Sequence, residues 1–138
     1  MSDNSKAPVA TAIVDMGATH YEVAIQTGTH RLKGDEPKPE GGDAGPSPFG
    51  LLLSSLGACT AITLRMYAER KQWPIEGVHV ELTFRWEDEG RARAAIERRI
   101  RLDGALGADQ RARMMEIAEK TPVTRAIKAG IAMATTLV

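Results

Sequence analysis

The feature that most constrains how this chain folds is a long, largely uncharged helical segment. Ser47 provides a side chain that can cap the helix, and Pro48 suits its first position, where no backbone N–H is needed. The helix is predicted to continue to about Lys71, because the residue before Pro74 is pushed away from helical angles. Such a helix would be roughly 36 Å long, about the diameter of a small domain. It is therefore expected to cross the whole molecule.

The first half of this helix, residues 51–62, carries no charged side chain. Its faces are all apolar or small, with Leu51, Leu52, Leu53, Leu56, Ala58 and Ile62 distributed around the axis. A helix of this kind is expected to be buried on every side. A chain of 138 residues has room for one core. Burial of the whole helix is therefore expected to need a second subunit.

The segment before the helix is predicted to hold a hairpin and a long loop. Strands are expected at residues 11–15 and 20–27, where apolar and polar side chains alternate. Residues 33–48 contain four glycines and four prolines, so they are expected to form a long loop. Loops of this length are usually either functional or disordered, which makes this loop a candidate for the wall of a site. Residues 1–8 are predicted to be a disordered tail, and residues 9–138 to be a single domain.

Two strands and two helices are predicted after the long helix. Residues 78–86 alternate clearly, and residues 93–102 place Arg98 on the same side as four apolar residues. An inward arginine needs a carboxylate, carbonyl or thiolate partner. A helix is expected at 108–120. Thr121 and Pro122 suit the start of a short helix that ends before Gly130, and residues 131–138 suit a final strand. The fold class is predicted as α+β.

Composition argues against several classes of partner. Lysine plus arginine and aspartate plus glutamate both total 18, so the net charge gives no reason to expect nucleic acid. No stretch approaching 20 apolar residues and no secretory segment is recognised, so a cytoplasmic protein without a membrane partner is expected. The three histidines, His20, His30 and His79, are not spaced as ligands of a shared metal. We predict no metal and no cofactor.

Cys59 is the one cysteine, so the chain cannot form an intramolecular disulfide. It can be a small buried apolar residue, which is common for free cysteine. Alternatively it can be a reactive thiolate, which needs a cation or strong hydrogen-bond donors nearby. Cys59 lies about three turns from the predicted start of its helix, too far to benefit from the partial positive charge there. A reactive Cys59 would therefore need help from another element.

The run from Asp35 to Leu82 resembles the signature region of the OsmC/Ohr family (osmotically inducible protein C-like and organic hydroperoxide resistance proteins). It resembles the branch in which Gly-Ala-Cys-Thr, ending here at Thr60, is followed by Thr-Leu-Arg-Met-Tyr-Ala. The resemblance continues from Gly104 to Ile127, over the family's second helix and its Cys-Pro-Val motif. Nearly the whole chain is covered.

The resemblance implies an OsmC-like fold, in which antiparallel sheets wrap around long central helices in an intertwined homodimer. It implies that Cys59 attacks organic hydroperoxides in an apolar pocket at the dimer interface and becomes a sulfenic acid, with which a second cysteine then condenses. Here Thr121 stands at the position of that second cysteine, Gly50 where a helix glutamate is frequent, and Thr124 where a histidine is common. A one-cysteine cycle that uses an external thiol reductant is therefore expected.

The cation that would activate Cys59 stays open at this stage. Arg125 lies in the retained part of the Pro-Val-Thr-Arg motif, and Arg31, Arg65 and Arg98 are alternatives. For each of these arginines the ordinary interpretation is a solvated or ion-paired side chain. Asp35 and Glu36 match the family's Asp-Glu-Pro loop and are interpreted as a site wall, a dimer contact or a simple turn.

Two functions are compatible with these residues. The first is thiol-dependent reduction of organic hydroperoxides through Cys59. The alternative is a non-catalytic protein that binds a small lipophilic ligand or senses oxidation through Cys59. No feature of the sequence favours a purely structural role.

Overall fold

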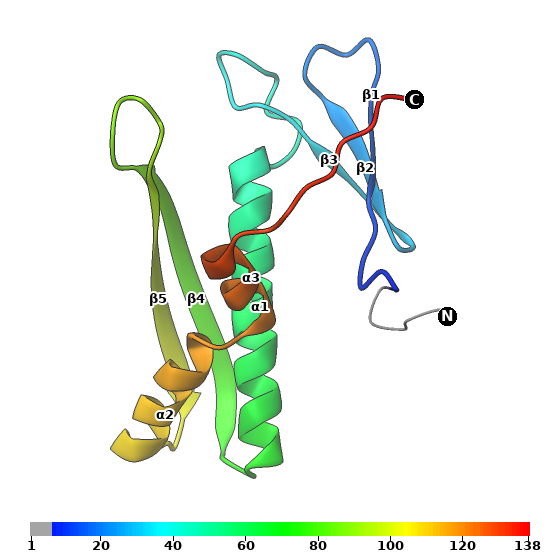
Figure 1. The fold of residues 1–138 in the computed structure, drawn as a ribbon. Helices are drawn as coiled ribbons and strands as arrows, with labels where there is room; N and C mark the ends of the chain where they lie inside the picture. The colour runs from blue at the N-terminus through cyan, green and yellow to red at the C-terminus, as the bar shows by residue number, and fades with distance from the viewer. Residues whose placement is uncertain (1–6) are drawn as a thin grey trace. The chain divides into compact units, whose positions relative to one another are not determined.

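A computed structural model describes residues 7–138, so most of the predicted tail Met1–Pro8 lies outside the described residues. The elements in chain order are β1 (Ile13–Met16), β2 (Val23–Thr27), β3 (His30–Gly34), α1 (Pro48–Arg70), β4 (Ile75–Trp86), β5 (Ala94–Gly104), α2 (Ala108–Ala118) and α3 (Pro122–Ala129) (Figure 1). The predicted α+β class is confirmed. The chain forms two compact units, up to Leu51 and from Leu52. A single domain over 9–138 stays a prediction.

The first unit is a three-stranded antiparallel sheet followed by a compact loop. The strand order is β1-β2-β3. The loop folds around the carboxylate of Asp35, which accepts the backbone N–H of Glu36 at 2.8 Å and of Ala44 at 3.0 Å. The N–H of Ala44 in particular stabilises the charged form and lowers the pKa of Asp35. A side chain at Gly41 would place its Cβ 2.3 Å from the carbonyl oxygen of Glu36, so this turn requires glycine.

Helix α1 starts and ends as the sequence predicts. The hydroxyl of Ser47 accepts the backbone N–H of Gly50 at 3.0 Å, which is the capping bond expected at a helix N-terminus. At the other end Gln72 takes a left-handed conformation with φ of 59°, and the N–H of Trp73 donates to the carbonyl of Ala68 at 2.8 Å.

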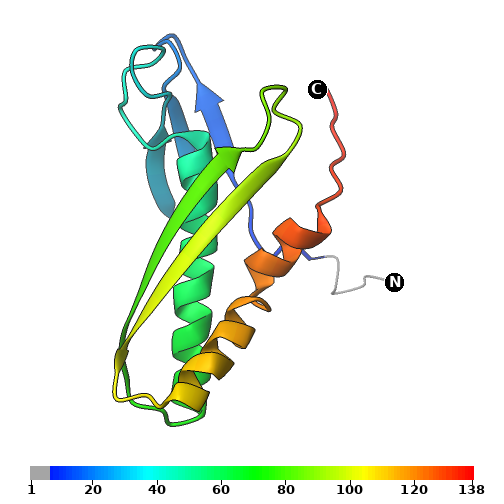
Figure 2. The ribbon, with the colours of Figure 1, turned by 90° about the vertical axis from the view of Figure 1, so that its left-hand side faces the viewer.

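The second unit packs a long hairpin and two short helices against α1. Strands β4 and β5 pair antiparallel, with Leu82 opposite Arg98, and the hairpin runs along α1 (Figures 1 and 2). Figure 2 shows α2 and α3 following one another in a line that starts beside the C-terminal end of α1 and slants away from it. The core comprises Leu64, Ala68, Leu102, Leu106, Met114 and Ala118, with Tyr67 and Trp73 packed at its margin. This core lies toward the C-terminal half of α1.

Within the single chain, α1 is buried along one side, so the expected burial of residues 51–62 on every side is not reached without a second subunit and stays a prediction. Its buried residues are Leu56, Thr60, Leu64 and Ala68, which repeat every four positions and form one narrow face. A second line of residues, Leu52, Ser55, Cys59, Ile62 and Met66, is largely uncovered, with Ile62 58% and Met66 54% exposed. We call this line the exposed stripe. One hairpin and two short helices are too narrow to cover both faces.

The expectation that no segment approaches a membrane span needs correction. Helix α1 is long and apolar enough to cross a membrane, judged by length and composition alone. The core helix of a soluble protein passes the same test. The charges of Arg65, Glu69 and Arg70 crowd its last turns.

The predicted final strand at 131–138 is also wrong for the single chain. These residues follow α3 as an irregular segment, and Ile131, Met133 and Leu137 are exposed. Strand propensity is a weak guide where no neighbouring strand offers its edge, because backbone pairing and side-chain packing supply most of the stability of a strand.

Candidate functional site

Cys59 lies in the exposed stripe of α1 as a free, half-buried thiol. Its sulfur accepts a hydrogen bond from the backbone N–H of Val123, with an N···S distance of 3.5 Å. The hydroxyl of Thr63, one turn further along α1, lies 3.9 Å from the same sulfur. Cys59 is therefore held by a donor from a distant part of the chain.

The donor, the backbone N–H of Val123, lies at the start of α3. Thr121 is the N-cap of this helix and Pro122 follows as its first residue, as predicted. Val123 comes next, where the backbone N–H has no acceptor inside the helix. The side chain of Thr121 forms no capping bond, so the sulfur of Cys59 takes the place of a capping oxygen. The N-terminus of a helix favours negative charge on such an acceptor.

The sequence analysis missed this contact because the N-terminus of α1 was the one helix terminus that it considered as a source of positive charge for Cys59. The signal that could have found it was present in the predicted start of the short helix at Thr121 and Pro122. What the sequence could not show is that residues 64 positions apart meet.

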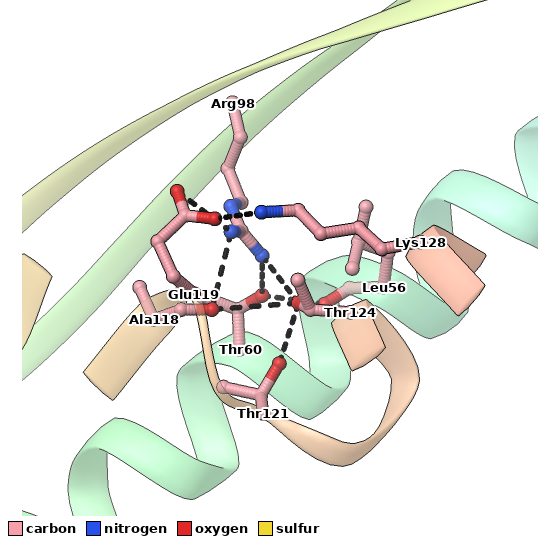
Figure 3. A network of polar contacts seen from close by, with 8 residues as sticks. All are labelled: Leu56, Thr60, Arg98, Ala118, Glu119, Thr121, Thr124 and Lys128. Carbon is pink, nitrogen blue, oxygen red and sulfur yellow. Dashed lines mark hydrogen bonds and ion pairs between the residues drawn. The ribbon is translucent and has the colours of Figure 1, made fainter. Parts of the chain in front are cut away.

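A polar network surrounds the guanidinium of Arg98 (Figure 3) and includes Thr60, which directly follows Cys59 in the sequence. One terminal nitrogen of Arg98 donates to the hydroxyl of Thr60 at 3.0 Å and to that of Thr124 at 2.9 Å. The other donates to the carbonyl of Ala118 at 3.1 Å and lies 3.7 Å from a carboxylate oxygen of Glu119. The side chain of Arg98 is only 12% exposed. The predicted inward position is confirmed, with carbonyl and carboxylate partners.

Two of the three positions that depart from the family pattern, Thr121 and Thr124, belong to this network. Thr121 is fully buried, and its hydroxyl lies 2.6 Å from that of Thr124. Thr60, also fully buried, donates to the carbonyl of Leu56 at 2.7 Å. Across residues 7–138, every buried side-chain nitrogen or oxygen has a hydrogen-bond partner. The threonines thus form a satisfied polar cluster.

Glu119 and Lys128 close the exposed side of the network by forming an ion pair. The hydrogen bond from Lys128, followed by the charge of Lys128 and that of Arg98, lowers the pKa of Glu119, although partial burial opposes this. Glu119 therefore stays negatively charged and balances one of the two neighbouring cations.

The other predicted site residues are less directly placed. Arg125 is exposed on α3, and Arg65 donates to the carbonyl of Glu76 at 3.2 Å. Within the part of the chain that the structure describes, neither forms a hydrogen bond with the Cys59 sulfur. Arg31, Asp35 and Glu36 belong to the first unit. Their proposed roles at Cys59 stay predictions.

An open cleft of about 510 Å³ lies beside this network in the second unit. Its walls are largely apolar and its polar residues are those of the network; the lining comprises Leu52, Leu56, Phe84, Ala94, Ile96, Ile127, Arg98, Glu119, Thr124 and Lys128. Cys59 is absent from this lining. The cleft has the size of a small-molecule site, but it does not reach the sulfur directly.

The described residues offer no group for a metal ion. Among residues 7–138, no three histidine, cysteine, aspartate or glutamate side chains come together as potential ligands. The chemistry available at this site is that of a thiol, a helix N-terminus and a buried guanidinium.

Comparison with known proteins now assigns the family. A family model described as OsmC-like protein matches residues 41–136, most of the chain. The chain belongs to the OsmC-like family. No curated protein matches it. The resemblance identified in the sequence is confirmed, and the OsmC-like fold with it.

Several solved structures share this OsmC-like fold. A protein from Psychrobacter arcticus, described as an osmotic stress induced and detoxification response protein, is 20% identical with a TM-score of 0.73, covering 86% of this chain and 88% of its own. An OsmC-like protein from Mycoplasma pneumoniae is 16% identical with a TM-score of 0.75, covering 88% and 89%. An organic hydroperoxide resistance protein OsmC from Legionella pneumophila is 18% identical with a TM-score of 0.67, covering 88% and 90%.

Proposed function

We propose that this protein reduces organic hydroperoxides through the thiolate of Cys59, in a one-cysteine cycle completed by an external thiol. The observation that carries the proposal is the bond from the N–H of Val123 to the Cys59 sulfur, because it directs the N-terminus of α3 at a half-buried thiol. The proposed reaction uses the thiolate, which is the nucleophilic form of cysteine, and the N–H of Val123 is placed to donate to it.

The proposed first step is an attack of the Cys59 thiolate on one oxygen of the hydroperoxide. A sulfur–oxygen bond forms as the oxygen–oxygen bond breaks, and the departing alkoxide takes up a proton to leave as an alcohol. The sulfur is oxidised by two electrons to a sulfenic acid, and the hydroperoxide is reduced by two.

The second half of the cycle depends on what stands at position 121. Thr121 has no sulfur, and its hydroxyl is buried and bonded to that of Thr124. An outside thiol would therefore attack the sulfenic sulfur and release water, giving a mixed disulfide. A second outside thiol would then release reduced Cys59 together with an external disulfide. A cytoplasmic location, where such thiols are kept reduced, is part of this proposal.

Membership of the OsmC-like family supports the proposed substrate class. The Legionella relative is described as an organic hydroperoxide resistance protein and redox protein, and a further relative from Bacillus subtilis, 18% identical with a TM-score of 0.61, is also described as an organic hydroperoxide resistance protein. We extend this class to the present chain and expect the apolar part of the substrate to lie along uncharged surfaces of α1.

We also propose that the protein is a homodimer in which the exposed stripe of α1 is covered by the second copy. The stripe follows an alternating spacing of three and four residues, which is typical of helices that pack side by side. Ile62 and Met66 within it are more than half exposed in the single chain. Cys59 lies on the same stripe, so its site would be completed at the boundary between subunits.

The direct test is consumption of cumene hydroperoxide with dithiothreitol or a dihydrolipoyl system as reductant. The wild-type protein should turn over, and Cys59→Ser should lose activity by about 100-fold or more, because serine is a far weaker nucleophile. Equal rates for the two proteins would rule out the proposal.

The cleft beside Arg98 favours a second function, the binding of a small lipophilic molecule without turnover. Mass spectrometry after mild peroxide treatment separates the two functions. A sulfenic adduct on Cys59 supports the redox role, including oxidation sensing. An inert thiol together with a co-purified apolar ligand supports binding alone.

A further inference from the structure

We infer that Arg98 is a positioning residue for the Cys59 site. It binds the residue after Cys59 and the residue after Val123, and so holds the start of α3 against the sulfur. We call this arrangement the clamp. Thr60 directly follows Cys59 in α1, and Thr124 directly follows Val123 in α3. The same guanidinium nitrogen donates to both hydroxyls. This inference rests on the proposed function for its biological meaning.

The clamp joins three elements that the sequence keeps far apart. Arg98 extends from β5, 38 residues from Thr60 and 26 residues from Thr124. Its second nitrogen holds the carbonyl of Ala118, at the end of α2. The turn between α2 and α3 is thus fixed at both of its ends to β5, and through Thr60 to α1 (Figure 3).

Burial makes this clamp effective. Thr60 is fully buried and Thr124 is 4% exposed, so water cannot readily replace the bonds that they accept from Arg98. A guanidinium presents its donors in a rigid planar fork, so one group can fix two acceptors in a set geometry. An ammonium group lacks this fork.

The clamp also gives a role to Thr121 and Thr124, two of the three positions that depart from the family pattern. Thr124 accepts from Arg98, and its hydroxyl in turn meets that of Thr121. Where the family has a second thiol, this protein has the hydroxyl of Thr121, which is linked through the hydroxyl of Thr124 to Arg98. We infer that these threonines hold the α3 N-terminus where a one-cysteine site needs it.

Position and charge can be separated, because Thr124→Val removes a hydroxyl and leaves every charge in place. The elements around the sulfur carry several charged groups, none of which Thr124→Val changes: Arg65, Glu69 and Arg70 of α1, Glu97, Arg98, Arg99, Arg101 and Asp103 of β5, Glu119 and Lys120 between α2 and α3, and Arg125 and Lys128 of α3. Arg98→Lys is the complementary variant, since it keeps the charge and loses the fork.

The experiment measures alkylation of Cys59 by iodoacetamide as a function of pH in the full-length protein. For both Thr124→Val and Arg98→Lys, we expect the rate near neutral pH to fall about tenfold and the profile to move to higher pH by about one unit. Ultraviolet absorbance of the thiolate should follow the same shift. Circular dichroism and thermal unfolding establish that each variant is folded.

Arg111→Met is the matched control. Arg111 also ties a helix to its neighbouring strand, since it donates to the carbonyls of Leu102, Gly104 and Leu106 at 2.9, 3.0 and 3.2 Å, and none of these residues adjoins Cys59 in the sequence. Its loss should lower the Tm and leave the alkylation profile unchanged.

Three results would overturn the inference. Folded Thr124→Val could alkylate like the wild type, Arg98→Lys could keep the wild-type profile, or Arg111→Met could shift the profile as far as Thr124→Val. Because alkylation needs no peroxide, these results are independent of turnover. A wild-type protein that does not consume hydroperoxide would refute the proposed function. The alkylation profiles would still test the positioning role of Arg98.

Discussion

The two long faces of α1 differ in a way that hydrophobicity does not explain. The buried face consists of Leu56, Thr60, Leu64 and Ala68, and includes a hydroxyl and a small methyl group. The exposed stripe carries Leu52, Ile62 and Met66, which are larger than the buried Thr60 and Ala68 and are nevertheless exposed. Burial followed the position of the hairpin and the short helices rather than the apolar character of the residues.

The comparison shows how a polar residue can be buried at low cost. Thr60 donates to the carbonyl of Leu56 and accepts from Arg98, so both functions of its hydroxyl are satisfied. In the exposed stripe, the hydroxyl of Ser55 donates to the carbonyl of Leu52, a bond that stays within α1. Cys59 is the exception, since its sulfur is bonded to α3 although it lies in the stripe. Cys59 therefore belongs to the exposed stripe by its position, although its sulfur is bonded to α3 within the same chain.

The largest expected effect is on the free energy of unfolding, which a substitution on the buried face should lower more than one on the exposed stripe. Leu64→Ala should lower the free energy of unfolding by about 2–5 kcal/mol, because it leaves a cavity in a fully buried position. Ile62→Ala should act only through the proposed dimer, so its effect should grow with protein concentration. Urea unfolding at several concentrations measures both. A concentration-independent loss for Ile62→Ala as large as that for Leu64→Ala would contradict the comparison.

An intermediate effect concerns assembly. Ile62→Lys should shift the protein toward monomer, since about 1.5–3 kcal/mol of side-chain burial would be lost at each copy of the site. Analytical ultracentrifugation measures the change. Glu89→Lys, at an exposed position in the turn between β4 and β5 and away from α1, is the control and should leave assembly unchanged. A monomeric wild-type protein would refute the proposed role of the stripe.

The smallest effect concerns Glu119, at the exposed edge of the network. Its pKa is lowered in the folded protein from the ordinary value of 4.5, chiefly by the hydrogen bond from Lys128. A lowered pKa stabilises the fold above the unfolded-state value and loses this contribution as the pH falls through the folded-state value. Glu119→Gln should therefore lower the Tm slightly near neutral pH.

Thermal unfolding across the acid range measures this difference. The Tm values of wild type and Glu119→Gln should converge below about pH 4.5. Glu89→Gln, an exposed carboxylate in the turn between β4 and β5, is the matched control. A Tm difference for Glu119→Gln that persists unchanged into acid would show that the carboxylate charge does not stabilise the network.

The sequence by itself determined the elements that depend on neighbours a few residues apart. Ser47 capped its helix, and Thr121 and Pro122 began theirs, as their local chemistry required. The alternation of β5 placed Arg98 on the inner side. The family was also readable, because its motifs are contiguous. All of these follow from periodicity and short-range hydrogen bonding.

Only the tertiary structure decided which face of α1 is covered and what meets Cys59. The Val123 N–H reaches the sulfur across 64 residues, and Arg98 ties α1 to α3 through contacts of similarly long range. Residues 131–138 stayed irregular in spite of their strand propensity. A pattern specifies the period of an element and the side that tends to be apolar. It does not specify the partner, because packing geometry between distant segments selects which surfaces meet.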